Sequence, residues 1–216
     1  MIDDPPLIRL RRRVPRPTSE QLRALQGRAA LACTIKPVVP EQAEFCGVAL
    51  PCHAGPADNL AVFAALPLIQ KGDVVVAAAD GYRETAVVGD LVLGMARNQG
   101  AVGFVTDGCV RDVPGIREVG LPCFASGITP NSPVKNGPGT VNLPIVVAGQ
   151  TVTAGDIIIG DAEGVVVIPY DLIDAVISSL ERVRASEAAL LARVAAGLGV
   201  PEWVEKLYQA GRVQEV

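Results

Sequence analysis

Short apolar runs alternate with amphipathic segments along the first two thirds of the chain. The runs are rich in Val, Ile, Leu and Ala and are bounded by Gly, Pro or Asp, which is typical of buried strands. They span residues 48–51, 73–79, 101–106 and 121–125. The segments between and before them begin near Ser, Thr, Asp or Asn and have apolar faces, which predicts helices. These helices cover residues 18–29, 58–69 and 90–100.

The last third of the chain has a different pattern. Residues 171–196 carry an apolar stripe at a spacing of about 3.6 residues, which predicts a long helix that ends at Gly197. Pro201 opens a final short helix. Because helices alternate with strands early and strands cluster late, we expect an α/β fold with a mixed sheet or β-sandwich, flanking helices and a long C-terminal helix. The late strands are expected at residues 143–147, 156–159 and 164–168, after a turn-rich loop at 126–140.

Length and hydropathy indicate one domain with appendages. We divide the 216 residues into a basic arm at 1–17, a main domain at 18–197 and a helical extension at 198–216. Half of the chain is hydrophobic and its mean hydropathy is +0.36, yet no run reaches the ~18 apolar residues of a membrane span. The surplus apolar surface therefore predicts a homo-oligomer and no membrane association.

Charge and cysteine usage narrow the function further. The arm at 1–17 carries +3, so the rest of the chain carries −7, which argues against a nucleic-acid surface. The five cysteines are odd in number and form no C-x-x-C pair, which favours a reducing cytoplasm over a disulfide or zinc framework. Cys52 precedes the only histidine, His53, so a Cys–His nucleophile is a minor alternative to a buried structural thiol.

The stretch VVGDLVLGMA places Gly89 and Asp90 at the start of a predicted helix. The first turn of a helix leaves backbone N–H groups unsatisfied and carries positive partial charge, and a glycine there lets a ligand approach closely. Such an end can bind a carboxylate or phosphate. An ordinary cap by Asp90 is the alternative explanation.

The stretch DGCVRD follows a buried strand and ends in Arg111 and Asp112. Asp107 and Gly108 are typical of a turn, but a turn does not explain the pair that follows. Arginine offers a planar fork to a carboxylate, and an aspartate can hold a magnesium-like ion whose other ligands are water and substrate. A local surface ion pair is the alternative.

Glu187 falls within the apolar stripe of the long helix. A carboxylate at such a position is costly unless it is paired. Arg184 lies one turn earlier and could pair with it. The other hypothesis is that this face covers a polar site, which could belong to another subunit.

These motifs together resemble one known family. GD-LVLGMARNQGAVGFVTDG-CVRD, followed by LPCFASG and GDIIIGDAEGVVVIP, is similar to the 4-hydroxy-4-methyl-2-oxoglutarate aldolases and the related regulators of RNase E activity. The resemblance covers roughly residues 18–197. It implies a swivelling β/β/α-type core and a trimer, often doubled to a hexamer, with sites between subunits.

The resemblance also implies the activity and the site. It implies a class II pyruvate aldolase, a lyase, that uses Mg²⁺ or Mn²⁺, cleaves 4-hydroxy-2-oxo acids and can decarboxylate oxaloacetate. By the same comparison Asp112 contacts the metal, Arg111 grips pyruvate, and the Leu91 and Val92 amides after Gly89 bind its carboxylate. Asp90 would order a metal-bound water together with Glu187 of the partner subunit.

Two other functions stay open at this stage. The first is a non-catalytic regulator that binds a ribonuclease of the RNase E type, although the long helix with Glu187 favours the enzyme. The second is a Schiff-base aldolase, which needs a buried lysine of lowered pKa. Among the four lysines, only Lys135 in the 126–140 loop is a plausible candidate.

Overall fold

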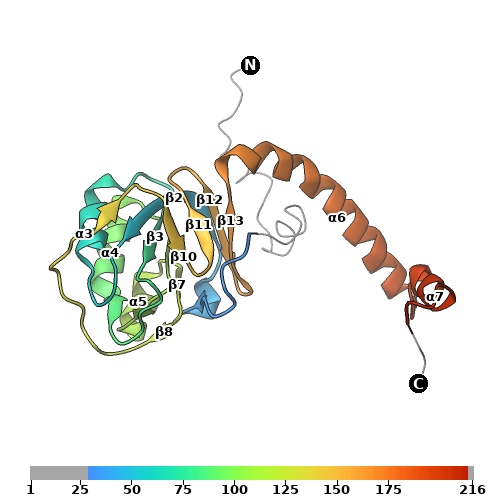
Figure 1. The fold of residues 1–216 in the computed structure, drawn as a ribbon, viewed down its shortest axis with the longest axis horizontal. Helices are drawn as coiled ribbons and strands as arrows, with labels where there is room; N and C mark the ends of the chain where they lie inside the picture. Colours follow the sequence, from blue (N-terminus) through green and yellow to red (C-terminus); the bar gives the residue numbers. More distant parts are fainter. Residues whose placement is uncertain (1–28, 214–216) are drawn as a thin grey trace, which may run out of the picture.

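A mixed eight-stranded sheet forms the centre of the molecule (Figure 1). It is seen in a computed structural model that describes residues 29–213, so the arm at 1–17 and nearly all of the predicted helix at 18–29 lie outside the described residues. The strand order is β1-β7-β5-β3-β2-β12-β13, and β9 pairs with β2. The strands are β1 (Lys36–Pro37), β2 (Phe45–His53), β3 (Asp73–Ala78), β5 (Gly103–Thr106), β7 (Cys123–Ala125), β9 (Thr140–Val141), β12 (Ile157–Asp161) and β13 (Gly164–Ile168).

The four central strands β2, β3, β5 and β7 run parallel, and the strands that flank them are antiparallel. Val75 of β3 pairs with Leu50 of β2 on one side and Phe104 of β5 on the other. All three are buried, as expected for parallel strands covered on both faces. The predicted mixed sheet is therefore confirmed: its parallel part contains the Val- and Ala-rich β3, and the Ile-rich strand β12 is antiparallel.

A small parallel sheet extends from the carboxyl edge of the central one. It consists of β4 (Ala86–Val88), β6 (Cys109–Val110) and β8 (Gly127–Ile128), in that order. Each of its strands follows β3, β5 or β7 in the chain, so the small sheet repeats the order of the strands that lead into it. This edge is where open α/β sheets usually bind ligands. A separate hairpin is formed by β10 (Ile145–Val147) and β11 (Gln150–Val152).

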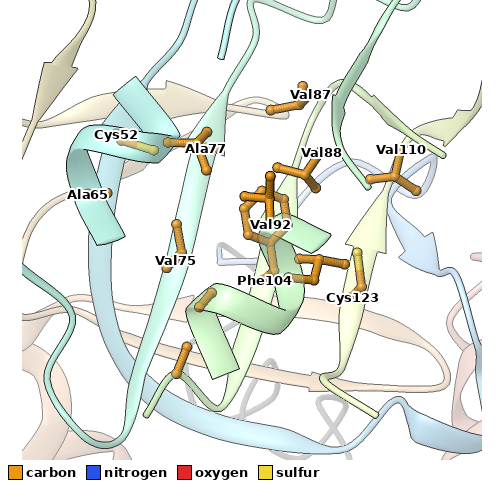
Figure 2. Close-up of a cluster of buried hydrophobic side chains, with 14 of the residues drawn as sticks. Cys52, Ala65, Val75, Ala77, Val87, Val88, Val92, Phe104, Val110 and Cys123 are labelled. Carbon is orange, nitrogen blue, oxygen red and sulfur yellow. The ribbon is translucent and has the colours of Figure 1, made fainter. Parts of the chain in front are cut away.

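Three helices cover one face of the sheet. They are α3 (Leu60–Ala65), which continues into the 3₁₀ turn Leu66–Leu68, α4 (Asp90–Gln99) and α5 (Val113–Val119). Figure 2 shows the core beneath them, in which Val92 of α4 packs with Phe104, Val75 and Val88. Since these side chains are buried, the amino end of α4 is held firmly against the ends of the strands.

Two further cores lie on the other side of the sheet and at its edge. Phe45 and Phe124 meet edge to face with ring centroids 5.4 Å apart, in a core shared with the β10–β11 hairpin. The second core packs α6 (Ile173–Ala195) on β12 and β13 through residues up to Leu180. Short 3₁₀ turns at Pro40–Gln42 and Tyr170–Leu172 complete these connections.

Beyond Leu180 the helix α6 leaves the body of the molecule and carries α7 (Glu202–Gln209) at its far end (Figure 1). Several large apolar side chains are exposed there, among them Leu191 and Trp203, at 68 % and 62 %. Within residues 29–213, no helix is long and apolar enough to cross a membrane.

The predicted order of elements is confirmed from residue 45 onward, with the following differences. DGCVRD is not a simple turn, because Cys109 and Val110 form a strand between β4 and β8. The turn-rich loop expected at 126–140 contains β8 and the start of β9, and the strands β4 and β11 were missed. The helix expected to run to Ile69 ends at Ala65, where Pro67 in the next turn lacks the N–H that would continue it.

Candidate functional site

A cavity of about 260 Å³ opens where the small parallel sheet meets the first turn of α4. Its walls come from four segments that are far apart in the sequence: the start of α3, residues 87–95, Arg111 and Asp112 directly after β6, and residues 132–135 of the long loop. Every predicted site residue except Glu187 lines it. The lining residues are Asn59, Phe63, Val87, Val88, Gly89, Asp90, Leu91, Val92, Met95, Arg111, Asp112, Ser132, Pro133 and Lys135.

Asp107 and Gly108 form the turn that leads the chain from β5 into β6 and so toward this site. The buried Asp107 accepts hydrogen bonds from the N–H groups of Ala79 and Gly81, at 2.6 and 3.1 Å, and so ties the ends of β3 and β5 together. A β-carbon at Gly108 would lie 2.6 Å from a methyl group of Val87, so only glycine fits. These contacts fix the direction in which the chain enters β6 and reaches Arg111.

Arg111 is held from three sides. Its backbone N–H donates to the Val88 carbonyl at 3.1 Å, its Nη1 donates to Ser132 Oγ, and its Nε lies 3.2 Å from Asp112 Oδ2. The side chain remains 36 % exposed, because its guanidinium lines the cavity. Arg111 and Asp112 therefore place a cation of fixed orientation beside a carboxylate in a concave site. Ser132 of the 126–140 loop also contacts the guanidinium.

Asp112 has an unusual backbone conformation at the start of α5. Its φ of 61° lies in the left-handed region, which aspartate tolerates better than most residues. Its carbonyl accepts the N–H of Ile116 at 2.9 Å, and its side chain is 47 % exposed. Left-handed non-glycine residues are often found at functional sites, and this one turns a carboxylate back toward the cavity.

Gly89 and Asp90 begin α4 beside this pair. A β-carbon at Gly89 would overlap Asp112 Oδ2 and come within 3.1 Å of Arg111 Cγ, so the absence of a side chain gives the carboxylate its place. Asp90 Oδ1 accepts the Leu91 N–H at 2.7 Å, and its Oδ2 lies over Gly115 of α5. Asp90 is the first residue of α4 after the cap position at Gly89, so its bond satisfies one first-turn N–H but does not make it the helix cap.

The wall formed by Asn59, Phe63 and Lys135 was not predicted as part of the metal and pyruvate site, and Lys135 was named only as the candidate lysine of a Schiff-base aldolase. Asn59 is only 4 % exposed, and its Nδ2 donates to the Val87 carbonyl at 2.9 Å. Because a carbonyl can only accept, this bond fixes the orientation of the amide. Asn59 Oδ1 is buried and has no hydrogen-bond partner among the described residues, a state that costs roughly 1–3 kcal/mol. Lys135 Nζ lies 5.3 Å from the centre of the Phe63 ring, within cation–π range.

Asp58 anchors the loop that carries Ser132 and Lys135. Its Oδ2 accepts the N–H groups of Asn136 and Gly137 at 2.6 and 2.9 Å, and its Oδ1 accepts that of Leu60 at 2.7 Å. Burial alone would raise the pKa of Asp58, but the backbone N–H donors outweigh it and the pKa is lowered. The sequence suggested Asp58 and Asn59 only as helix-capping residues, because nothing local reveals their pairing with a loop about 78 residues later.

The donors present fit a weakly held hard cation. Asp112 offers a half-exposed carboxylate in the space left by Gly89, and Asp90 supplies a second carboxylate in the same wall. Within residues 29–213 no group of three or more His, Cys, Asp or Glu side chains could hold a metal ion. Mg²⁺ is commonly bound through one or two carboxylates with water and substrate as the other ligands, so this set suits it.

Two expectations rest on residues outside the cavity. Glu187 is half-buried on α6, beyond the part of that helix that packs on the body, and it does not line the cavity of its own chain. Its predicted contribution to the site of another subunit stays a prediction. Cys52 is fully buried and burial raises its pKa to about 12, while His53 Nε2 lies 2.9 Å from Asp80 Oδ1. A Cys52–His53 nucleophile is therefore not supported.

The fold and the cavity define an α/β protein in which an Arg–Asp pair and a helix amino end line a cavity beside a mixed sheet. The chain belongs to the RraA-like family, because the family model described as Aldolase/RraA matches residues 17–167. This confirms the family expected from the sequence motifs.

Relatives in the family carry different names. The chain is 39 % identical over 166 residues, 77 % of its length and 79 % of the relative, to a Halalkalibacterium halodurans protein provisionally named a 4-hydroxy-4-methyl-2-oxoglutarate aldolase. Among solved structures it is similar to the RNA-processing inhibitor RraA from Thermus thermophilis, with 27 % identity, a TM-score of 0.66, and 72 % and 94 % of the two chains covered. It is also similar to RraAS2 of Streptomyces coelicolor, described as an unusual member of the RNase ES inhibitor RraA family, with 25 % identity, a TM-score of 0.75, and 88 % and 98 % covered.

Proposed function

We propose that this protein is a divalent-metal-dependent class II pyruvate aldolase that cleaves 4-hydroxy-2-oxo acids such as 4-hydroxy-4-methyl-2-oxoglutarate and can decarboxylate oxaloacetate. The observation that carries the proposal is the oriented Arg111–Asp112 pair in a cavity that also contains the first turn of α4. The aldolase name of a relative 39 % identical to the chain supports the same class of reaction.

Substrate binding follows from the charges in the cavity. The carboxylate of a 2-oxo acid would lie at the start of α4, where the Leu91 and Val92 N–H groups and the positive end of the helix favour an anion. The Leu91 N–H already donates to Asp90, so the incoming carboxylate would share or replace that bond. Arg111 would bind the keto oxygen, on which negative charge develops as the carbon–carbon bond breaks.

Asp112 would hold Mg²⁺ or Mn²⁺, since its carboxylate faces the cavity and is half-exposed. The bound cation would supply Lewis acidity for the developing enolate oxygen. Asp90, together with Glu187 of the partner subunit, would hold the water that carries protons to and from the substrate. Arg111 orients and stabilises the reacting oxygen in each step.

A protein-binding regulator is the second candidate, because one related structure is described as an RNA-processing inhibitor and another as a member of the RNase ES inhibitor family. Such a role needs a docking surface and makes no use of a concave site that combines a guanidinium, two carboxylates and a helix end. The cavity therefore favours the enzyme. A Schiff-base aldolase is disfavoured because Lys135 is exposed, whereas that chemistry requires a desolvated lysine.

The assembly and the compartment belong to the same proposal. Exposed apolar side chains on the projecting part of α6 and on α7 fit a homotrimer or hexamer in which these helices contact a neighbouring subunit. Five free cysteines, of which Cys52, Cys109 and Cys123 are buried, fit the reducing cytoplasm.

The test is pyruvate release from 4-hydroxy-4-methyl-2-oxoglutarate and from oxaloacetate, measured with and without metal. Treatment with EDTA followed by desalting is expected to abolish release, and Mg²⁺ or Mn²⁺ is expected to restore it. Full activity in the metal-free protein would overturn the mechanism. Absence of turnover in every metal, with tight binding to an RNase E-type ribonuclease, would favour the regulator.

A further inference from the structure

The guanidinium of Arg111 has a second protein partner, Ser132, to which the chemistry assigned above gives no role. Ser132 Oγ accepts a hydrogen bond from Nη1, while Nε lies 3.2 Å from Asp112 Oδ2. Within residues 29–213, no side chain or carbonyl binds Nη2, so that nitrogen can bind a ligand in the cavity. Ser132 and Asp112 therefore determine together how Arg111 faces the cavity.

A divalent cation would change the balance between these two contacts. In the proposed function the Asp112 carboxylate binds Mg²⁺ or Mn²⁺, so the charge that attracts Nε is shared with the metal. The cation also repels the neighbouring guanidinium, because like charges at short range interact unfavourably. The hydroxyl of Ser132 is neutral, so its bond to Nη1 does not depend on the metal.

The tip of the Arg111 side chain is the part that needs this bond. A β-carbon built at Gly89 would lie 3.1 Å from Cγ and 3.3 Å from Nε, so the stem of the arginine lies against the start of α4. The side chain is partly exposed, and its terminal group can turn toward water when no partner holds it. Ser132 is the partner that holds the end of the guanidinium.

Asn131 fixes the position of Ser132 on the strand that leads to α4. The Asn131 carbonyl accepts the Ala86 N–H at 2.9 Å, and its Nδ2 donates to the Glu84 carbonyl at 2.8 Å. Because a carbonyl can only accept, the second bond also sets the orientation of the amide. The residue before Ser132 is thus bonded to the beginning of β4 through its backbone and its side chain.

A further bond ties the same segment to the strand that carries Arg111. The Thr129 N–H donates to the Val110 carbonyl at 3.0 Å, and Val110 directly precedes Arg111. This attachment lies on the opposite side of Ser132 from the anchor that Asp58 provides at residues 136 and 137. Although Ser132 is exposed, its hydroxyl is therefore held at a defined place relative to the arginine.

We propose that Ser132 is a positioning residue that keeps the Arg111 guanidinium facing the cavity when a divalent cation occupies Asp112. Asn131 acts through Ser132, by fixing it on β4. The proposal rests on the aldolase function proposed above and gives the 126–140 loop a part in it. Neither residue needs to touch the substrate.

Oxalate tests this role without turnover, because it is a planar dianion with adjacent oxygen-bearing carbons, like a pyruvate enolate, and is not cleaved. Its Kd in Mg²⁺ is measured by calorimetry in the wild type, in Ser132→Ala, in Arg111→Ala and in the double variant. Ser132→Ala should weaken binding about tenfold, the lower end for a hydrogen bond to a charged group. In the Arg111→Ala background the same change should have no effect, because the hydroxyl acts only through the guanidinium.

Two further variants control for the substitution itself. Ser132→Thr keeps the hydroxyl and should bind oxalate nearly as well as the wild type. Ser178→Ala removes a serine hydroxyl that donates to the Asp174 carbonyl within α6 at 2.9 Å, so it should leave the Kd unchanged. A loss in Ser132→Thr as large as in Ser132→Ala would overturn the proposal, because the effect would then not come from the hydroxyl.

The affinity for Mn²⁺ alone separates positioning from general damage to the cavity. It should be unchanged in Ser132→Ala, because the serine holds the arginine and not the metal. A fall in Mn²⁺ affinity as large as the fall in oxalate affinity would overturn the positioning role.

Asn131→Ala tests the second step. The variant loses the bond to the Glu84 carbonyl and keeps the backbone bond from Ala86, so oxalate should bind about threefold more weakly. In the Ser132→Ala background this change should have no further effect. Equal weakening in both backgrounds would overturn the part assigned to Asn131.

The possible outcomes distinguish this role from the aldolase function. Equal oxalate binding in the wild type and Ser132→Ala, or the same loss with and without Arg111, overturns the positioning role and leaves the aldolase proposal standing. If oxalate does not bind the wild type in Mg²⁺, both proposals fail. If Ser132 and Arg111 are coupled in oxalate binding but no substrate releases pyruvate, the positioning role stands and the aldolase function fails.

Discussion

Gly89 lies so close to Asp112 that a β-carbon at position 89 would overlap the Oδ2 atom of the aspartate. The φ of Gly89 is −128°, which any residue can adopt, so the need for glycine comes from the neighbouring carboxylate and from Arg111. The start of α4, which follows β4, and the carboxylate of Asp112, which follows β6, thus share one space, and this contact builds the proposed metal corner.

Gly89→Ala should remove most of the activity with little loss of stability. The added methyl group displaces the Asp112 carboxylate, while the backbone is unstrained. Pyruvate release and Mn²⁺ affinity should both fall, with Tm nearly unchanged. Gly94→Ala in the same helix is the control, because its β-carbon would meet Val119 at an ordinary 3.8 Å. The free energy of unfolding of this variant should rise by about 0.5–1 kcal/mol, and its activity should be unchanged. Equal activity in both variants would contradict the steric argument.

Arg111→Ala should lower kcat by about 10²- to 10³-fold, the usual cost of losing a group that stabilises a developing oxyanion. Arg111→Lys should recover little, because an ammonium cannot contact Ser132 and Asp112 with the planar geometry of the guanidinium. Steady-state kinetics and circular dichroism measure the two effects. An intact fold with unchanged kcat would assign the arginine a structural role only.

Asp112→Asn should weaken metal binding while preserving the fold. Asparagine tolerates the left-handed φ of 61° as well as aspartate does, so the substitution removes charge without backbone strain. Titration of Mn²⁺ followed by electron paramagnetic resonance should show a higher Kd in the variant. If wild type and variant bind Mn²⁺ equally, the metal site lies elsewhere.

Asp58→Asn should loosen the loop that carries Ser132 and Lys135. Asp58 uses both oxygens to accept backbone N–H groups, and an asparagine must place its NH₂ group against one set of donors. Hydrogen exchange should rise in residues 131–139, with a smaller change elsewhere. Asp73→Asn is the control, because Asp73 accepts the Gln70 N–H through one oxygen, a bond that an asparagine amide oxygen can keep. Comparable exchange in both variants would argue against this anchor.

The same loop should respond to acid. Because the pKa of Asp58 is lowered in the folded state, its contribution to stability is present above the ordinary aspartate pKa of about 3.9 and is lost as the pH falls through the lower folded value. The protection of residues 131–139 against hydrogen exchange, taken relative to the intrinsic exchange rate at each pH, should therefore fall below about pH 4 in the wild type. In Asp58→Asn this pH dependence should disappear, and its persistence would assign it to another group.

Co-expression of two inactive variants tests the role of Glu187. If the glutamate completes the site of a neighbouring subunit, Arg111→Ala and Glu187→Gln should each be poorly active alone. A mixed oligomer would contain sites in which both residues are wild type, so part of the activity should return. No recovery in isolated mixed oligomers would place the catalytic function of Glu187, if it has one, within its own chain.

The local sequence pattern was sufficient to predict much of the fold and the side of the cavity that is formed by the start of α4 and the Arg–Asp pair. Strands such as Asp73–Ala78 are continuous apolar runs because both of their faces are buried, and α4 begins and ends where Gly89 and Gly100 interrupt the pattern. Gly89, Asp90, Arg111 and Asp112 could be named in advance because each follows directly after a strand or opens a helix. The short strand β6 was missed because two residues give too little alternation to identify a strand.

By itself the sequence determined the order of elements and the apolar runs of the central strands, and it predicted Arg111 and Asp112 as candidate site residues, since these features depend on neighbours along the chain. Only the tertiary structure placed Asn59 and Lys135 beside that pair and showed that Asp58 anchors a loop 78 residues away. The physical reason is that a side-chain hydrogen bond between distant segments leaves no periodic trace in either segment, unlike the packing of apolar faces. A buried acceptor without a donor, such as Asn59 Oδ1, becomes visible only when all of its spatial neighbours are known.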